Sequence, residues 1–144
     1  MQEEAKNFLN LGVVVKQVRE VLYILFIRRV KKEKGENGVL EWAFPGGRQR
    51  LRETREECVK REVLTETGYK VEPIRQISIR KHPQFPVIIV YHLCKLASPK
   101  QVAAPAEPHE IAEIRWVTLK ELKSLITSNL DPKVERELIL LAKS

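Results

Sequence analysis

The chain has 144 residues, of which 43% are hydrophobic and 31% are charged. These values describe a soluble globular protein of one domain, residues 1–144, which is large enough to bury a hydrophobic core without disulfides or a structural metal. The net charge is +7. This excess of basic side chains suits a polyanionic ligand such as a nucleotide or a nucleic acid, and it suits an ordinary solvated surface equally well.

Short segments of the sequence exclude several classes of protein. The N-terminus is polar and acidic, unlike a signal peptide, and the longest apolar run, residues 21–27, is too short to cross a bilayer. Cys58 and Cys94 lie in segments that are expected to be buried, so we expect two buried thiols in a reducing compartment rather than a disulfide framework. No Cys and His spacing indicates zinc. We therefore expect a cytoplasmic protein.

In chain order, the sequence first predicts a β-hairpin. Residues 12–18 and 21–29 are rich in Val, Ile, Leu, Tyr and Phe, and the second strand is apolar enough to be covered on both faces. Residues 1–10 are expected to form a loosely docked start. Residues 31–38 form a charged loop with two glycines, which we expect to be solvated rather than to contact phosphate.

A helix is predicted after the Pro-Gly-Gly turn and the short basic loop that follows it. Thr54 and Glu57 have the spacing of a capping box, and Gly68 is the expected C-terminal stop. Glu62 and Glu66 are four residues apart, so they lie on one face of this helix. Neighbouring carboxylates repel each other unless a cation lies between them, and Mg²⁺ is a cation that carboxylate oxygens bind.

The second half of the chain predicts three strands and two helices. Residues 98–109 hold three prolines and three alanines and form a loop. Thr118 caps a helix through Glu121, and Asp131 with Pro132 begins the last helix. The strands are expected at residues 69–80, 87–96 and 110–117.

The stretch from residue 42 to residue 69 resembles the signature of the Nudix hydrolases, G-x5-E-x7-R-E-U-x-E-E-x-G-U, in which U is a bulky apolar residue. Thr65 stands where the first of the paired glutamates is expected. The alternative is an ordinary solvated helix, but chance agreement at six fixed positions is roughly one in ten million windows. The six matching positions are Gly47, Glu53, Arg61, Glu62, Glu66 and Gly68.

This resemblance implies a fold and an activity. The fold is of the α/β (α+β) class, an α/β/α sandwich around a mixed β-sheet, which fits the order of hairpin, helix, strands and two helices. The activity is MutT-like, Mg²⁺-dependent hydrolysis of a pyrophosphate linkage in a nucleoside triphosphate or another nucleoside diphosphate derivative, with Mn²⁺ as the alternative ion. The expected partner is the nucleotide substrate, with no membrane and no nucleic acid, and a homodimer is left open.

Two other functions remain open at this point. One is hydrolysis of ADP-ribose or of a dinucleotide. The other belongs to a different class, a Nudix-fold module that binds nucleotide for regulation and has lost catalysis, as the substitution at Thr65 would explain. Metal-dependent turnover separates the enzymes from the binding module.

The resemblance also assigns the catalytic residues. Glu62 and Glu66 would supply carboxylates to the metal, either could serve as general base, and neither is expected to belong to the core. Glu53 and Arg61 would form a partly buried pair that anchors the loop against the helix and orients the site. Gly46 and Gly47 would let the backbone turn sharply and approach the ligand closely.

Thr65 leaves the metal site short of one carboxylate. Either the site holds fewer metal ions, or one of the acids outside the signature compensates. For Glu56 and Glu57 the favourable charge at a helix N-terminus is the preferred explanation. Of the other two candidates, Glu107 and Glu110, we predict Glu110 as a metal ligand.

Selection of the nucleobase should depend on aromatic side chains near the site. The candidates are Phe85, Tyr91 and Trp116, although each such residue is more often part of a core.

Overall fold

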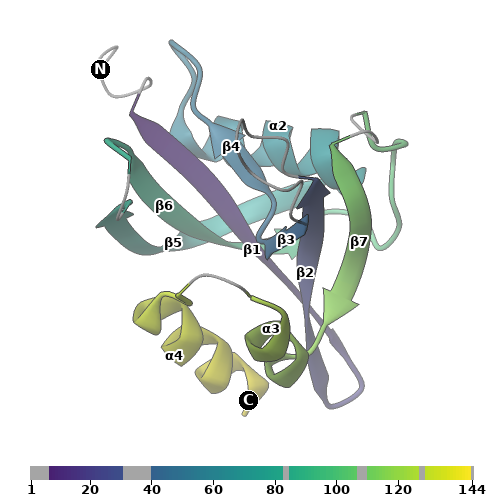
Figure 1. The fold of residues 1–144 in the computed structure, drawn as a ribbon. Helices are drawn as coiled ribbons and strands as arrows, with labels where there is room; N and C mark the ends of the chain where they lie inside the picture. The colour runs from purple at the N-terminus through teal and green to yellow at the C-terminus, as the bar shows by residue number, and fades with distance from the viewer. Residues whose placement is uncertain (1–6, 31–39, 83–84, 107–109, 127–128, 144) are drawn as a thin grey trace.

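The structure is a computed structural model that describes residues 7–30, 40–82, 85–106, 110–126 and 129–143. A mixed β-sheet runs through the centre of the molecule, with helix α2 (Arg55–Thr67) on one side and helices α3 (Leu119–Leu125) and α4 (Pro132–Ala142) on the other (Figure 1). This arrangement confirms the predicted α/β/α sandwich.

The sheet of the described residues has seven strands in the order β3-β2-β1-β6-β5, with β4 paired to β1 and β7 paired to β2. Strands β1 and β6 run parallel, whereas the other pairs are antiparallel, so the sheet is mixed. The strands are β1 (Phe8–Val18), β2 (Val21–Val30), β3 (Leu40–Ala43), β4 (Gly46–Arg48), β5 (Val71–Lys81), β6 (Ile88–Leu96) and β7 (Ile111–Val117).

Strand β1 joins the parts of the sheet because it pairs with three other strands. Its first half lies between β4 and β6, and its last residues form the predicted hairpin with β2. The expectation of a loosely docked start is therefore wrong for Phe8, Leu9 and Asn10, which belong to β1. The strands that hold these residues come from much later in the chain, and the local sequence does not reveal them. Residues 1–6 lie outside the described residues.

Two apolar clusters fill the space between the sheet and its helices. Buried side chains of β2 alternate between these clusters, as expected for a strand covered on both faces. The cluster on the side of α3 and α4 includes Ile24, Phe26, Phe44, Leu122, Val134 and Leu138. The cluster on the side of α2 includes Val14, Leu25, Val59, Val63 and Cys94.

The predicted helix ends are confirmed. Thr54 and Glu57 form a capping box at the start of α2, and Gly68, with φ of 79°, ends this helix. A second capping box starts α3, and the Asp131 side chain accepts backbone N–H bonds at the start of α4. The predicted charged loop at residues 31–38 lies outside the described residues.

The cysteines are buried as predicted. Cys58 and Cys94 are free thiols, and burial raises the pKa of each to about 12. Among the described residues, no helix has the length and apolar character that crossing a membrane requires.

Candidate active site

Strand β4 follows the turn after β3. It pairs with β1 on one side and contacts α2 on the other. A side chain at Gly46, whose φ is 154°, would place its Cβ 2.2 Å from the carbonyl oxygen of Asn10. A Cβ at Gly47 would lie 2.6 Å from Oε2 of Glu62. Gly46 is therefore required by the close approach of the β1 backbone, whereas the group that lies closest to Gly47 is the end of the Glu62 side chain.

The predicted pair of Glu53 and Arg61 is present in the structure. Nε of Arg61 donates to Oε2 of Glu53 at 2.6 Å, and Nη2 donates to Oε1 at 3.0 Å. These hydrogen bonds hold the pKa of Glu53 below its usual value and raise the pKa of Arg61. Since Nη2 also donates to the carbonyl oxygen of Arg48 at 3.1 Å, the pair fixes the end of β4 to the middle of α2.

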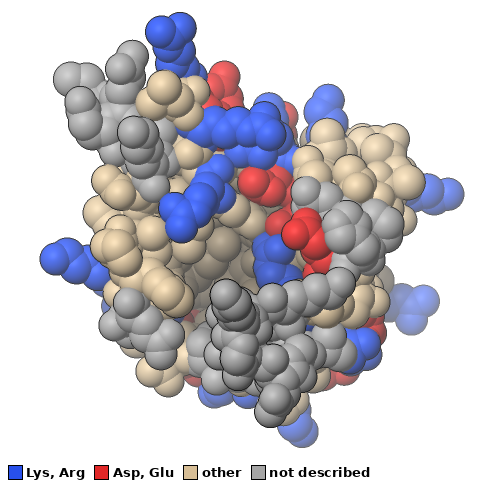
Figure 2. Space-filling view, turned by 45° about the horizontal axis from the view of Figure 1, so that its top comes forward, with Lys and Arg blue, Asp and Glu red and all other residues tan. Residues whose placement is uncertain are grey.

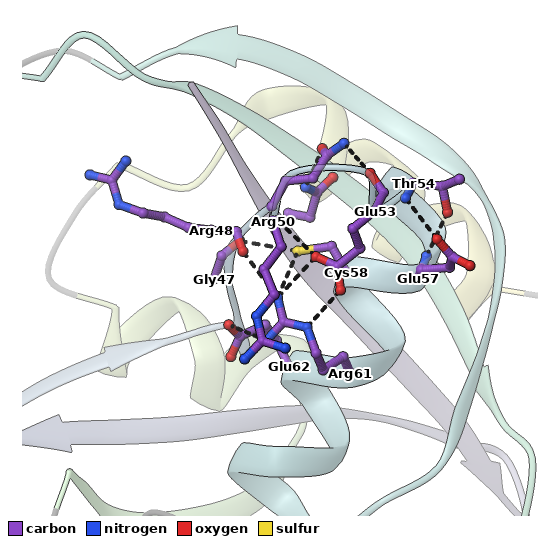
Figure 3. Close-up of polar contacts among 11 residues, drawn as sticks. Gly47, Arg48, Arg50, Glu53, Thr54, Glu57, Cys58, Arg61 and Glu62 are labelled. Atoms are coloured by element: carbon purple, nitrogen blue, oxygen red, sulfur yellow. Dashed lines mark hydrogen bonds and ion pairs between the residues drawn. The ribbon is translucent and has the colours of Figure 1, made fainter. Parts of the chain in front are cut away.

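Arg61 also forms a hydrogen bond with Glu62. Its Nη1 donates to Oε2 of Glu62 at 3.1 Å, and Figure 3 shows the side chains of Glu53, Arg61 and Glu62 converging between the loop and the helix. The Glu62 side chain is 18% exposed. One side of the carboxylate is therefore fixed by the protein while the group keeps contact with solvent.

The second carboxylate, Glu66, is buried, and this corrects the expectation that neither acid belongs to the core. The residue is only 3% exposed, because Glu66 lies three residues after Val63 and seven after Val59, on the helix face that packs on the sheet. Burial raises the pKa of Glu66 to about 7, although Arg29 and the backbone N–H of Gly46 act in the opposite direction.

Both oxygens of Glu66 have partners within the protein. The N–H group of Gly46 donates to Oε1 at 2.9 Å, and Nη2 of Arg29 donates to Oε2 at 2.7 Å. The same nitrogen of Arg29 donates to the carbonyl oxygen of Gly46 at 3.0 Å. A cationic nitrogen thus lies between a carboxylate oxygen and a carbonyl oxygen.

Arg29 is a site residue that the sequence analysis missed. A signal was available, because Arg29 follows Leu25 by four residues in a strand, and side chains at even spacing share one face. Leu25 packs in the cluster beneath α2. The alternation therefore directs Arg29 to the α2 face, where Glu62 and Glu66 were expected.

The acidic groups present fit a divalent cation only with the help of further ligands. Within the described residues, no group of three or more His, Cys, Asp or Glu side chains is close enough to hold a metal ion. Glu62 and Glu66 share one helix face, and the position between Glu66 and Gly46 already holds a positive group. Such oxygen donors fit Mg²⁺, which keeps several waters and substrate phosphate oxygens as its other ligands.

The remaining candidate acids have different places. Glu57 belongs to the capping box, and Glu56 lies beside it in the first turn of α2, which agrees with the preferred explanation. Glu110 is exposed just before β7, and its carbonyl oxygen accepts from the N–H group of Val30 at 3.0 Å. Its role as a metal ligand stays a prediction. Glu107 lies outside the described residues.

Thr65 lies in the last half of α2, where the chain after β6 crosses the helix. Its side chain is partly exposed, and its carbonyl oxygen accepts from the N–H group of Ala106 at 2.8 Å. The Thr65 hydroxyl is not among the groups that bond to the Glu66 carboxylate, which are Arg29 and the N–H group of Gly46.

Basic side chains lie near the carboxylates. The space-filling view in Figure 2 shows a hollow with Lys or Arg side chains along its rim and acidic side chains beside them. The exposed arginines here are Arg48, at the end of β4, and Arg50 and Arg52, in the loop before α2. Figure 3 shows that the side chain of Arg48 extends away from the cluster.

The three aromatic candidates have separate environments. Tyr91 lines a cavity of about 60 Å³ together with Trp42, Phe44 and Asp131. Phe85 lines a different pocket, of about 430 Å³, between the start of β1 and the turn between β5 and β6. Trp116 packs against Tyr69 after the end of α2 and donates to its hydroxyl at 3.1 Å. Only Tyr91 adjoins the strand that leads into the Gly-Gly turn.

Known structures resemble this fold. A NUDIX hydrolase from Nitrosomonas europaea aligns with a TM-score of 0.70 and 18% identity, over 93% of this chain and 70% of that chain. The MutT protein from Methanosarcina mazei Go1 aligns with a TM-score of 0.63 and 18% identity, over 98% and 96%. A UDP-X diphosphatase aligns with a TM-score of 0.61 and 20% identity, over 95% of this chain and 62% of that chain. No curated protein sequence is significantly similar to the chain.

Sequence similarity to a family model extends over nearly the whole chain. The model of the NUDIX domain matches residues 6–138, a range that contains the seven strands, α2, α3 and most of α4. This match agrees with the signature at residues 47–69 and supports the predicted pyrophosphohydrolase. The chain belongs to the NUDIX domain family.

Proposed function

We propose that the protein is a Mg²⁺-dependent pyrophosphohydrolase that cleaves a nucleoside triphosphate or another nucleoside diphosphate derivative. Hydrolysis of pyrophosphate linkages in nucleotide derivatives is the general activity of Nudix enzymes. One observation carries the proposal. Glu62 and Glu66 lie on one face of α2 beside the Gly46–Gly47 backbone, and each carboxylate is oriented by a different arginine.

The residues of the site would have two roles, which are to bind the metal ion and to orient the carboxylates that bind it. Glu62 and Glu66 would hold the metal ion, and Arg61 with Glu53 would keep Glu62 in place. When bound, a divalent ion neutralises charge on phosphate oxygens and makes a water molecule more acidic. One of the two carboxylates would accept the proton of the attacking water, since both lie within the same helix face.

Basic side chains near the carboxylates support a polyphosphate substrate. The exposed arginines at positions 48, 50 and 52 add positive charge to the loop before α2, which favours binding of a polyanion. Trp42, Phe44 and Tyr91 line a cavity on the strands that lead to this loop. Phe44 and Tyr91 belong to the core cluster on the side of α3 and α4, so their contact with a nucleobase stays a prediction.

A second enzymatic substrate class has specific support. One structural neighbour is a UDP-X diphosphatase, so a nucleoside diphosphate linked to another group is a candidate beside the triphosphates, as are ADP-ribose and the dinucleotides. We place the protein in the cytoplasm, because the free buried thiols of Cys58 and Cys94 suit a reducing compartment. We also propose that residues 1–144 form one domain.

The proposed function is tested with a panel of nucleotides incubated with Mg²⁺ or Mn²⁺. The panel contains nucleoside triphosphates, nucleotide sugars, ADP-ribose and dinucleotides, and release of phosphate, pyrophosphate or nucleoside monophosphate is measured. We expect turnover that requires the metal and disappears in Glu62→Gln. The matched control is Glu72→Gln, which removes an exposed carboxylate paired with Lys60 at 3.6 Å and should keep full activity. Nucleotide binding without turnover on the whole panel would instead establish the binding module.

A further inference from the structure

Three polar side chains are buried next to one another in the sheet and the loop beside it. Asn10 on β1 is 0% exposed, His92 on β6 is 1% exposed, and Gln49, directly after β4, is 9% exposed. A buried polar group costs free energy unless it is hydrogen-bonded. These three groups form bonds to one another in a row that begins in the core and ends at the loop before α2.

The hydrogen bonds in this row can point in only one direction. The carbonyl oxygen of Glu53 accepts only, so Nε2 of Gln49 donates to it, at 2.8 Å. Oε1 of Gln49 then accepts from Nδ2 of Asn10 at 3.0 Å. Oδ1 of Asn10 is left as an acceptor, so Nε2 of His92 carries a hydrogen and donates to it at 2.8 Å. Every bond is satisfied with a neutral imidazole ring.

The row ends at the backbone of the residue whose carboxylate organises the site. Glu53 accepts from the N–H group of Arg50 through Oε1, at 2.9 Å, and it holds Arg61 with both oxygens. Arg61 in turn donates to Glu62. A continuous series of polar contacts therefore connects the core of the sheet to a carboxylate of the candidate active site.

Gln49 anchors the loop through its side chain and through its backbone N–H group, which donates to the carbonyl oxygen of Phe8 at 3.0 Å. Of residues 48–57, all of which the structure describes, only Gln49 is buried, and the apolar side chain of Leu51 is 52% exposed. Arg52 has φ of 67°, in the left-handed region that few residues with a side chain adopt. The apolar cluster between α2 and the sheet contains no side chain from residues 48–57.

We infer that Asn10, Gln49 and His92 are positioning residues, which hold the loop at residues 49–53 so that the Glu53–Arg61 pair presents Glu62 to the substrate. None of the three occupies a fixed position of the Nudix signature, although Gln49 lies among the five variable residues between Gly47 and Glu53. The effect on catalysis rests on the proposed function, whereas the effect on the loop does not. Loss of one bond in the row should loosen the loop while the sheet and α2 remain folded.

The smallest change that breaks the row is Gln49→Glu. The new oxygen can accept from Asn10 but cannot donate to the Glu53 carbonyl, so the last bond becomes a repulsive contact. We expect the amide hydrogens of Arg50 and Glu53 to exchange about tenfold faster, because their local opening loses one hydrogen bond. Mn²⁺ affinity, measured by electron paramagnetic resonance, should fall, and kcat should fall more than KM rises.

His92 provides a matched pair of variants. His92→Gln places an amide N–H near the position of Nε2 and should keep the loop amides protected, whereas His92→Phe keeps the ring without the donor and should not. Val134→Ala serves as the stability control, since Val134 is fully buried in α4 on the opposite layer. It should lower the melting temperature without changing loop exchange or Mn²⁺ affinity.

The outcomes separate the inference from the proposed function. Loop amides that exchange at the wild-type rate in both Gln49→Glu and His92→Phe would overturn the inference, whatever the melting temperatures are. Wild-type protein that neither binds Mn²⁺ nor turns over nucleotide would overturn the proposed function, and the exchange measurements would still decide the role of the three residues. If His92→Phe does not fold, Gln49→Glu at the edge of the loop decides alone.

Discussion

Arg29 donates a hydrogen bond to Glu66 at 2.7 Å, across a separation of 37 residues in the sequence. The carboxylate that the Nudix signature assigns to metal binding is therefore already neutralised by a cation from β2. The guanidinium group is partly exposed, with 32% of the side chain accessible, whereas the Glu66 side chain is only 4% accessible. The guanidinium group of Arg29 is therefore accessible to solvent, whereas the Glu66 carboxylate that it contacts is buried.

Replacement of Arg29 tests this relationship. Arg29→Gln should lower the free energy of unfolding of the metal-free protein by about 3 kcal/mol, because a buried carboxylate loses its charged partner. Mg²⁺ or Mn²⁺ should then raise the melting temperature more in the variant than in the wild type, since the ion supplies the missing charge. Thermal unfolding with and without the metal measures both effects.

The neighbouring arginine is the control for this experiment. Arg28 is 3.3 Å from Glu113, and both side chains are about a third exposed, so Arg28→Gln should cost less than about 1 kcal/mol. An equal metal-dependent shift in Arg29→Gln and in the wild type would show that the metal does not approach Glu66.

The two proposed metal ligands should both be needed for turnover. Glu62→Gln and Glu66→Gln should each remove nearly all turnover in saturating Mg²⁺, because the ion loses a charged ligand. Glu62→Gln should leave the melting temperature close to that of the wild type, since its carboxylate keeps contact with solvent. Activity assays and thermal unfolding are the measurements, and retention of most activity by both variants would contradict the site assignment.

The local features of the fold could be predicted from the sequence, and the long-range contacts could not. Helix α2 begins and ends where Thr54 and Gly68 indicate, because a capping box and a C-terminal glycine act within a few residues. Asn10 has its partners at Gln49 and His92, which are 39 and 82 residues away. Nothing near Asn10 in the sequence reveals that β4 and β6 lie on its two sides.

The burial of Glu66 is an intermediate case. Its spacing from Val59 and Val63 places it on the packed face of α2, yet a carboxylate at such a position is normally excluded from a core. The partner that makes its burial tolerable, Arg29, lies in another strand. The sequence pattern therefore gave the direction of the side chain but not the charge that stabilises it.

The pair of Glu53 and Arg61 predicts strong thermodynamic coupling. Their side chains are 12% and 23% exposed, so Glu53→Ala or Arg61→Ala should each cost about 2–4 kcal/mol by leaving one charge without its partner. The double variant should be no less stable than the worse single variant. Chemical unfolding of the four proteins measures the coupling, and strictly additive losses would mean that the two groups act independently.

His92 predicts a particular dependence of stability on pH. Burial lowers the pKa of this histidine from 6.5 to about 4, with a smaller opposing effect of Glu56. Between these values the unfolded chain binds more protons than the folded protein, so the stability that His92 supports is complete above pH 6.5 and is lost as pH falls toward 4. The full loss is about 3 kcal/mol, at about 1.4 kcal/mol for each unit of pKa.

Comparison with His92→Gln isolates this effect. The variant has no group that titrates at this position, whereas Glu66, whose raised pKa has the opposite effect on stability, is present in both proteins. The difference in free energy of unfolding between wild type and variant should therefore shift in favour of the variant from pH 7 to pH 4, in metal-free buffer. Parallel stability curves would show that His92 is protonated equally in both states.

Thr65→Glu restores the residue that the Nudix signature expects. Residue 65 follows Glu62 by three positions in α2, so the new carboxylate lies close enough to bind the same ion. Apparent Mg²⁺ affinity should rise, and turnover should rise with it at metal concentrations below saturation. The metal-free protein should become slightly less stable because three carboxylates then repel one another. Metal titration of activity and the metal-free melting temperature measure these effects.

Thr65→Gln is the matched control, since it has the same length as glutamate without the charge and should change neither quantity. If the wild type binds nucleotide without turnover and Thr65→Glu creates activity, the protein is a binding module whose catalysis was lost at this position. If the wild type is active and Thr65→Glu leaves its metal dependence unchanged, residue 65 lies outside the metal site. In that case Glu62 and Glu66, with phosphate oxygens of the substrate and water, are sufficient to hold the ion.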